Sequence, residues 1–348
     1  MAALTDAERF DRALGALVGG ALGDAMGMPT QTLSPAAIEA IWGRVEDFVP
    51  PPADHPVSAG LEAGAITDDT EQALLLARLL AEGRKPFGAE AWAAALLAWE
   101  ADVRRRGLLD LLGPSTKRAV EAIGRGVPPD EAGRFGNTNG AAMRAGPMGI
   151  LVPPVPLEAL VDRVEETCRP THNTGLAISG AAAVAAAVSA AVEGASWPEA
   201  AALAVEAARE GEKRGHWAAG ARVGQRIAWA LDFSRGRPRA QAIAAMRDLV
   251  GTSVAVQESV PAAFAVVEVA GGDPWDCAVI AANLGGDTDT IGAIAAGMAG
   301  ALQGFSHLPQ DKVRRLRGFD VPEARRLATS LLALREGRAA AADGRSAA

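Results

Sequence analysis

The sequence contains no tyrosine and only two cysteines and four histidines among its 348 residues. Cys168 and Cys277 lie far apart, without the short spacing of a thiolate metal site, and they are too few for a disulfide framework. Disulfide-stabilised miniproteins and zinc-thiolate domains are therefore excluded. We expect both cysteines to be buried thiols in a reducing compartment.

A strongly basic surface is also missing. The formal net charge is -8, and no segment is dense in lysine or arginine, which argues against nucleic acid or an anionic membrane as the main partner. The N-terminus carries Asp6, Glu8 and Asp11 instead of the basic residues of a signal peptide, and the alanine-rich run from Ala181 to Val192 is short and weakly apolar. We therefore expect a cytoplasmic protein that binds no membrane.

The alternation of apolar and polar residues that marks β-strands is absent as well, whereas helical spacing recurs along the chain. Abundant alanine and leucine favour helices over strands. We predict one all-α domain over residues 1–337, followed by a disordered tail over residues 338–348. The predicted helices cover residues 5–24, 36–41, 71–80, 89–103, 115–123, 157–168, 176–192, 197–210, 221–233, 257–270, 275–282, 291–302 and 322–334.

Two acidic clusters each precede an apolar helical stripe. Thr67-Asp68-Asp69-Thr70 stands ahead of residues 71–80, and residues 283–290, Asn-Leu-Gly-Gly-Asp-Thr-Asp-Thr, stand ahead of residues 291–302. A helix N-terminus stabilises one carboxylate by capping, but neighbouring carboxylates repel each other. Carboxylate and hydroxyl oxygens suit Mg²⁺ or Mn²⁺, so two such helix starts brought face to face would form a two-metal site. The alternative is a pair of solvated helix caps.

Two further motifs lie between predicted helices. The segment from Gly136 to Arg144 places backbone N–H groups at a helix start with an arginine in the first turn, a pattern that can bind phosphate. A plain structural turn is the alternative. Thr171-His172-Asn173-Thr174 precedes the next helix, and a single histidine there is either a structural residue or a site residue.

Together these motifs resemble the ADP-ribosylglycohydrolase family. The motifs Gly23-Asp24-Ala25-Met26-Gly27, Thr67-Asp68-Asp69-Thr70, Asn139-Gly140-Ala141-Ala142-Met143-Arg144, Thr171-His172 and Gly285-Gly286-Asp287-Thr288-Asp289-Thr290 follow the family's order. The resemblance implies an orthogonally packed all-α domain. It also implies a dinuclear Mg²⁺ or Mn²⁺ centre that cleaves glycosidic bonds to ribose.

The resemblance also implies roles for particular residues. The implied metal ligands are Thr67, Asp68, Asp69, Asp287, Asp289 and Thr290. The residues expected to contact the substrate are Gln31, Asn139, Gly140, Ala141, Met143, His172, Gly285, Gly286 and Thr288. Because the chain has no tyrosine, stacking on adenine would fall to phenylalanine or tryptophan.

The expected reaction is hydrolysis of the glycosidic bond to an ADP-ribosyl group by water activated at two metal ions. Asp68, Asp69, Asp287 or Asp289 would accept the proton, and Glu258 is a candidate donor to the leaving group. The expected partner is a small ADP-ribosyl or ribosyl substrate, or an ADP-ribosylated protein.

Gln31 departs from the family pattern, because many members have a glutamate there that covers the ribose. A neutral amide at this position fits an alternative function, N-glycosidase activity on a nucleoside or other small ribosyl compound. A non-catalytic binding or structural protein is a third possibility. The intact clusters of aspartate and threonine argue against it, because such polar groups are costly to keep together.

Overall fold

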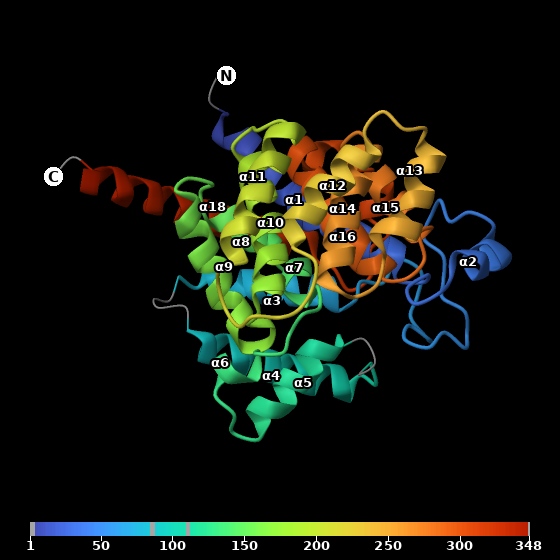
Figure 1. Cartoon of the computed structure of the whole chain (residues 1–348), viewed down its shortest axis with the longest axis horizontal. Coiled ribbons are helices and arrows are strands. Elements are labelled where there is room, and N and C mark those ends of the chain that lie inside the picture. The colour runs from blue at the N-terminus through green and yellow to red at the C-terminus, as the bar shows by residue number, and fades with distance from the viewer. Residues whose placement is uncertain (1–3, 84–87, 109–111, 347–348) are drawn as a thin grey trace.

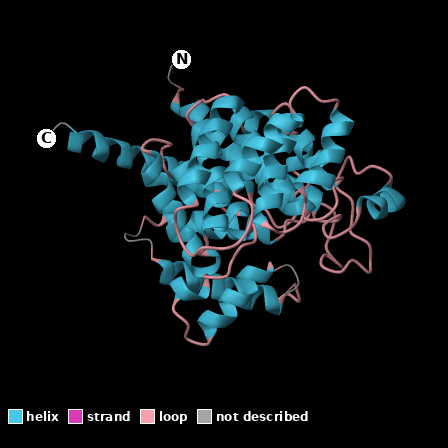
Figure 2. Cartoon of the chain, viewed as in Figure 1, coloured by secondary structure: helices cyan, strands magenta, loops and turns pink. Residues whose placement is uncertain are grey.

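The computed structural model describes residues 4–83, 88–108 and 112–346 (Figure 1). Helices joined by loops make up this part of the chain, in which no strand occurs, and the predicted all-α fold is confirmed (Figure 2). The helices are α1 (Asp6–Gly27), α2 (Pro35–Trp42), α3 (Asp68–Ala81), α4 (Ala89–Arg105), α5 (Pro114–Gly124), α6 (Pro129–Ala132), α7 (Gly140–Met143), α8 (Gly146–Leu151), α9 (Leu157–His172), α10 (Gly175–Val192), α11 (Trp197–Gly211), α12 (Val223–Ser234), α13 (Arg239–Ala245), η2 (Met246–Val250), α14 (Val256–Val269), α15 (Pro274–Ala282), α16 (Thr288–Gln303), η3 (Phe305–His307), α17 (Gln310–Val313) and α18 (Val321–Ser346).

The helices α1 and α16 form an antiparallel central pair whose backbones touch. Glycines at every fourth residue of α1 share one face of the helix, and this face lies against α16. A Cβ atom on Gly15 would stand 2.2 Å from the carbonyl oxygen of Gly300, and one on Gly27 would stand 2.3 Å from that of Thr288. This packing brings the C-terminal end of α1 to the N-terminal end of α16, where the second acidic cluster begins.

The alanine-rich helix α10 lies in the core. It is long and apolar enough to cross a membrane, yet all of its residues are buried inside the protein. Small side chains let the neighbouring helices approach closely, and α10 packs against α8, α9 and α11. Its burial on every side is that of a core helix.

Element boundaries differ from the predicted ones mainly at short helices and at the C-terminus. Helix α7 lies at the predicted helix start between Gly136 and Arg144, whereas the short helices α6, α8, α13 and α17 were not predicted, because so few residues do not show a clear 3.6-residue period. Helix α18 continues beyond the predicted end at residue 334 to Ser346, since the alanines that follow favour a helix. The predicted disorder of residues 338–348 stays a prediction.

Candidate active site

Both acidic helix starts reach one buried cluster at the C-terminal end of α1. Asp68 and Asp69 open α3, and Asp287 and Asp289 flank the first residue of α16. Asp24, near the end of α1, is fully buried beside them. We call these five residues the acidic cluster. In the described part of the chain, none of the five carboxylates forms an ion pair with a lysine, arginine or histidine.

Asp24 holds the start of α3 in place. Its carboxylate accepts hydrogen bonds from the backbone N–H groups of Thr67 and Thr70, at 2.9 and 3.1 Å, and from both hydroxyls. It therefore caps a helix that is more than forty residues away in sequence, at a position where Thr67 itself provides no side-chain cap. Burial raises the pKa of Asp24 to about 6, against these hydrogen bonds.

The remaining carboxylates of the acidic cluster destabilise one another when ionised. Burial raises the pKa of Asp69 well above its usual value, and the charge of Asp289 raises it further. The pKa of Asp289 is raised in the same way by burial and by Asp287, and that of Asp68 by burial and by Asp24. These mutual effects follow from the closeness of the two helix starts, and the metal site expected between them stays a prediction.

The oxygens of this cluster suit a hard cation. Atom Oδ1 of Asp69 is buried and has no hydrogen-bond partner in the described part of the chain, and a buried charged oxygen is costly without one. As they stand, no three described His, Cys, Asp or Glu side chains are arranged to hold an ion. Aspartate and threonine oxygens nevertheless match Mg²⁺ or Mn²⁺ in chemistry, and a cation would relieve the repulsion.

Asn139 connects the acidic cluster to the loop before α7. Its side-chain amide donates to Asp287 and, at 2.9 Å, to the hydroxyl of Ser259. Its backbone N–H donates to the carbonyl of Val254 at 3.0 Å, which ties this loop to the segment before α14. The predicted site residue Asn139 therefore lies at the cluster, and Gly140, Ala141 and Met143 follow it on α7.

His172 is buried and contacts this loop through Thr138. Its two ring nitrogens contact the hydroxyls of Thr138, at 3.0 Å, and Thr171, at 2.7 Å. The ring packs on Gly140, where a Cβ atom would stand 2.9 Å from its Cε1. Burial lowers the pKa of His172 well below its usual value, so the imidazole is neutral. The predicted contact of His172 with the substrate stays a prediction.

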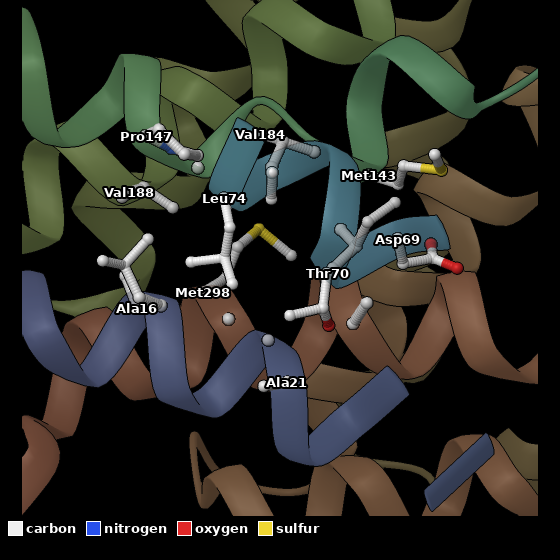
Figure 3. Close-up of a pocket in the computed structure, with 17 residues that line it drawn as sticks. Ala16, Ala21, Asp69, Thr70, Leu74, Met143, Pro147, Val184, Val188 and Met298 are labelled. Carbon is white, nitrogen blue, oxygen red and sulfur yellow. The ribbon is translucent and has the colours of Figure 1, made fainter. Parts of the chain in front are cut away.

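A small cavity lies among α1, α3, α8, α10 and α16 (Figure 3). Its volume is about 40 Å³, room for a few water molecules. Asp69 and Thr70 are the residues with polar side chains that line it, while Met143, Leu74 and Met298 belong to its apolar wall. A cavity of this size and lining is too small and too apolar to hold a nucleotide.

Two exposed aromatic side chains, Phe135 and Trp217, lie on loops that form hydrogen bonds with Thr174 and Asn173. Phe135 is 63% exposed, and the next residue, Gly136, accepts a hydrogen bond from the Thr174 hydroxyl. Trp217 is 88% exposed and follows His216, whose backbone N–H donates to the carbonyl of Asn173. These loops lie beside the segment that leads to Asn139.

A family model described as ADP-ribosylglycohydrolase matches residues 5–341. The chain belongs to the ADP-ribosylglycohydrolase family. Members of this family are hydrolases that act on ADP-ribosyl linkages.

Known proteins are similar to this chain over most of its length. The uncharacterized protein YegU of Escherichia coli K12 is 36% identical over 95% of this chain and 99% of its own length. The ADP-ribosylarginine hydrolase Tri1 of Pseudomonas putida GB-1 is 28% identical over 90% of this chain and 76% of its own. A solved structure titled ADP-ribosylglycohydrolase-related protein complex shares the fold, with a TM-score of 0.70, 25% identity, and coverage of 94% of this chain and 99% of that one.

Three of the residues expected to contact the substrate also make packing contacts or hydrogen bonds within this ADP-ribosylglycohydrolase fold. Gly286 has a positive φ of 82° and lies against Thr252, and its N–H already donates to Leu33. Gly285 packs in the same manner against Pro35. The Thr288 hydroxyl donates to the carbonyl of Gly27. The roles of these three residues in substrate binding stay predictions.

Glu258, Arg144 and Gln31 also have partners within the fold. The carboxylate of Glu258 accepts from the N–H and hydroxyl of Ser253 and so closes a loop. Arg144 follows the last residue of α7 and is 1% exposed, so it cannot meet a phosphate in solvent. Gln31 is buried, and its amide donates to Ser58 at 3.0 Å.

The sequence prediction missed Asp24 and Gln72 as site residues. Asp24 was noticed only as part of a glycine-rich motif, although a lone aspartate near the end of an apolar helix stripe was an available signal. Gln72 lies four residues after Asp68 on the same helix face and approaches its carboxylate at 3.4 Å.

Proposed function

We propose that this protein is a metal-dependent hydrolase that cleaves the glycosidic bond to an ADP-ribosyl group. In this proposal two Mg²⁺ or Mn²⁺ ions are held by Thr67, Asp68 and Asp69 on the α3 side and by Asp287, Asp289 and Thr290 on the α16 side. The observation that carries the proposal is the acidic cluster itself. Its carboxylates have no basic partner in the described part of the chain, and Asp69 keeps an unpartnered buried oxygen.

The chemistry of the proposed reaction is divided between the ions and the chain. Bound divalent cations supply positive charge that lowers the pKa of water and polarises vicinal ribose hydroxyls. A cluster carboxylate that is not neutralised accepts the proton from the attacking water. Asn139 restrains Asp287 by its amide hydrogen bond, which keeps the carboxylate oriented toward the reacting atoms.

The substrate side of the proposal rests on the loops around Asn139. The segment 137–139 is fixed by His172 through Thr138 and by Val254, so its backbone is preorganised for the ribose and phosphates. Stacking on adenine would fall to Phe135 or Trp217, the exposed aromatic residues beside this segment. Because the relative Tri1 is named an ADP-ribosylarginine hydrolase, ADP-ribosyl-arginine is the first substrate to test.

Gln31 supports a second candidate function. Its neutral amide is engaged by Ser58, and it cannot take part in acid–base chemistry as a glutamate would. Cleavage of a nucleoside or another small ribosyl compound needs fewer contacts to a diphosphate. This alternative predicts activity on nucleosides that exceeds activity on ADP-ribosyl compounds.

A substrate panel on chelator-treated protein tests both functions. ADP-ribosyl-arginine, ADP-ribosyl-serine and ordinary nucleosides are each incubated with Mg²⁺ or Mn²⁺, and wild type is compared with Asp289→Asn. The control Asp276→Asn makes the same change at the start of α15, where the carboxylate pairs with Arg239 outside the acidic cluster.

The expected result is metal-dependent release of ADP-ribose that is lost together with metal binding in Asp289→Asn and kept in Asp276→Asn. Because Asp289→Asn removes a ligand charge and relieves repulsion, its metal-free form should be at least as stable as wild type. Equal turnover with and without added Mg²⁺ or Mn²⁺, or full activity in Asp289→Asn, would refute the proposal.

A further inference from the structure

Arg144 is a cation in the core without a carboxylate partner. It is 1% exposed, and in the described part of the chain it forms no ion pair. The guanidinium lies 5.2 Å from the ring centroid of Trp92, donates to the hydroxyl of Thr171 at 2.6 Å and donates to the side-chain oxygen of Gln72. Burying a charged arginine costs desolvation free energy. Because the partners of Arg144 are uncharged and do not offset this cost by an ion pair, its burial needs a functional reason.

Gln72 carries the contact from Arg144 to the acidic cluster. Its side chain is fully buried, its amide oxygen accepts from Arg144, and its amide nitrogen approaches Asp68 Oδ2 at 3.4 Å. No other side chain in the described residues donates a hydrogen bond to Asp68. An amide that accepts with one end and donates with the other has a fixed orientation, because Arg144 can only donate.

We propose that Arg144 and Gln72 are positioning residues for Asp68. Arg144 packs on Trp92 and donates to the amide oxygen of Gln72, which sets the orientation of that amide, and the amide N–H then holds the Asp68 carboxylate in one rotamer. The inference rests on the proposed function, in which Asp68 binds a metal ion. It goes beyond that function because it assigns metal affinity to residues that never touch the ion.

The contacts from Arg144 through Gln72 to Asp68 explain how the Asp68 carboxylate is kept in place beside other carboxylates. Asp68 is repelled by Asp24, Asp287 and Glu71, and without a donor its side chain would turn away from them. A positive charge two contacts away attracts the carboxylate without occupying the place of a cation. Partners of metal ligands that act in this manner typically change metal affinity by about 10–100-fold when they are removed.

Calorimetric titration with Mn²⁺ of chelator-treated full-length protein tests the inference. Gln72→Leu keeps the approximate volume and removes both hydrogen bonds of the amide. Its matched control is Thr171→Val, which also removes one acceptor from Arg144 but leaves the contact between Gln72 and Asp68. Gln72→Asn is a second variant that keeps a polar side chain in the core, yet is one methylene too short to reach both partners. The Tm of each metal-free protein is measured alongside.

We expect the Kd for Mn²⁺ to rise at least about tenfold in Gln72→Leu and Gln72→Asn, and less than about threefold in Thr171→Val, although Thr171→Val also lowers the metal-free Tm. Equal affinity in wild type and both Gln72 variants would overturn the inference and leave the proposed function standing. Equal losses in Thr171→Val and the Gln72 variants would overturn it as well, because affinity would then follow stability. Wild-type protein that binds no Mn²⁺ at millimolar concentration would overturn the proposed function itself.

Discussion

Replacing Gly23 by alanine would place a methyl group inside the backbone of α16. A Cβ atom built on Gly23 stands 2.0 Å from the carbonyl oxygen of Gly292 and 2.3 Å from its carbonyl carbon, whereas ordinary van der Waals contact begins at 3.4 Å. The difference between 3.4 and 2.0 Å means that the helices must separate by about 1.4 Å here. Both obstacles are backbone atoms, so no side-chain rotation can relieve the clash.

The cost follows from the packing and from helix propensity. Overpacking in a core lowers the free energy of unfolding by about 1–3 kcal/mol and sometimes more. Within a helix, alanine is more favourable than glycine by about 1 kcal/mol. Because this clash is rigid, we expect a net loss of about 3 kcal/mol. At about 2.1 cal/mol/K per residue, the unfolding entropy of 348 residues is roughly 0.7 kcal/mol/K. The Tm of Gly23→Ala should therefore fall by about 4 °C.

Gly20→Ala is the matched control on the same helix. The nearest atom to its added Cβ is the carbonyl oxygen of Ala293 at 3.6 Å, which is ordinary contact. Its Tm should stay the same or rise by about 1 °C, through helix propensity alone. Thermal unfolding followed by circular dichroism compares the two variants with wild type. If Gly23→Ala melted at or above the temperature of Gly20→Ala, direct backbone contact between α1 and α16 at Gly23 would be refuted.

Two further predictions concern Asp24 and Gln31. Burial raises the pKa of Asp24 from 3.8 to about 6, so its protonated form stabilises the metal-free fold below about pH 4, and this contribution is lost as the pH rises through 6. The Tm of chelator-treated wild type should thus fall relative to Asp24→Asn between pH 4 and 7, and a relative rise would contradict the raised pKa. For Gln31→Glu we expect kcat/KM on ADP-ribosyl substrates to rise relative to nucleosides, because a carboxylate would then cover the ribose. An unchanged ratio of kcat/KM values would place Gln31 away from the substrate.

The sequence determined the fold class and the two acidic helix starts, because both are local properties. Helical periodicity, capping residues and the preference of alanine for helices act within a few residues, and the predicted long helices occur in the structure with ends shifted by a few residues, α18 excepted. Family membership was equally accessible, since its motifs are short and contiguous. The predicted roles of Asp68, Asp69, Asp287 and Asp289 stay predictions, although the structure brings all four together.

The tertiary structure decided which partners these polar residues have. Asp24 is 43 residues from Thr67 in sequence, yet it holds the start of α3, and only the close approach of the glycine faces of α1 and α16 brings it to Asp289. Thr288 and His172 carry polar groups that suit a site, but their buried partners are Gly27 and two threonines. A side chain's partners depend on contacts between distant segments, and these contacts exist only after the helices have packed.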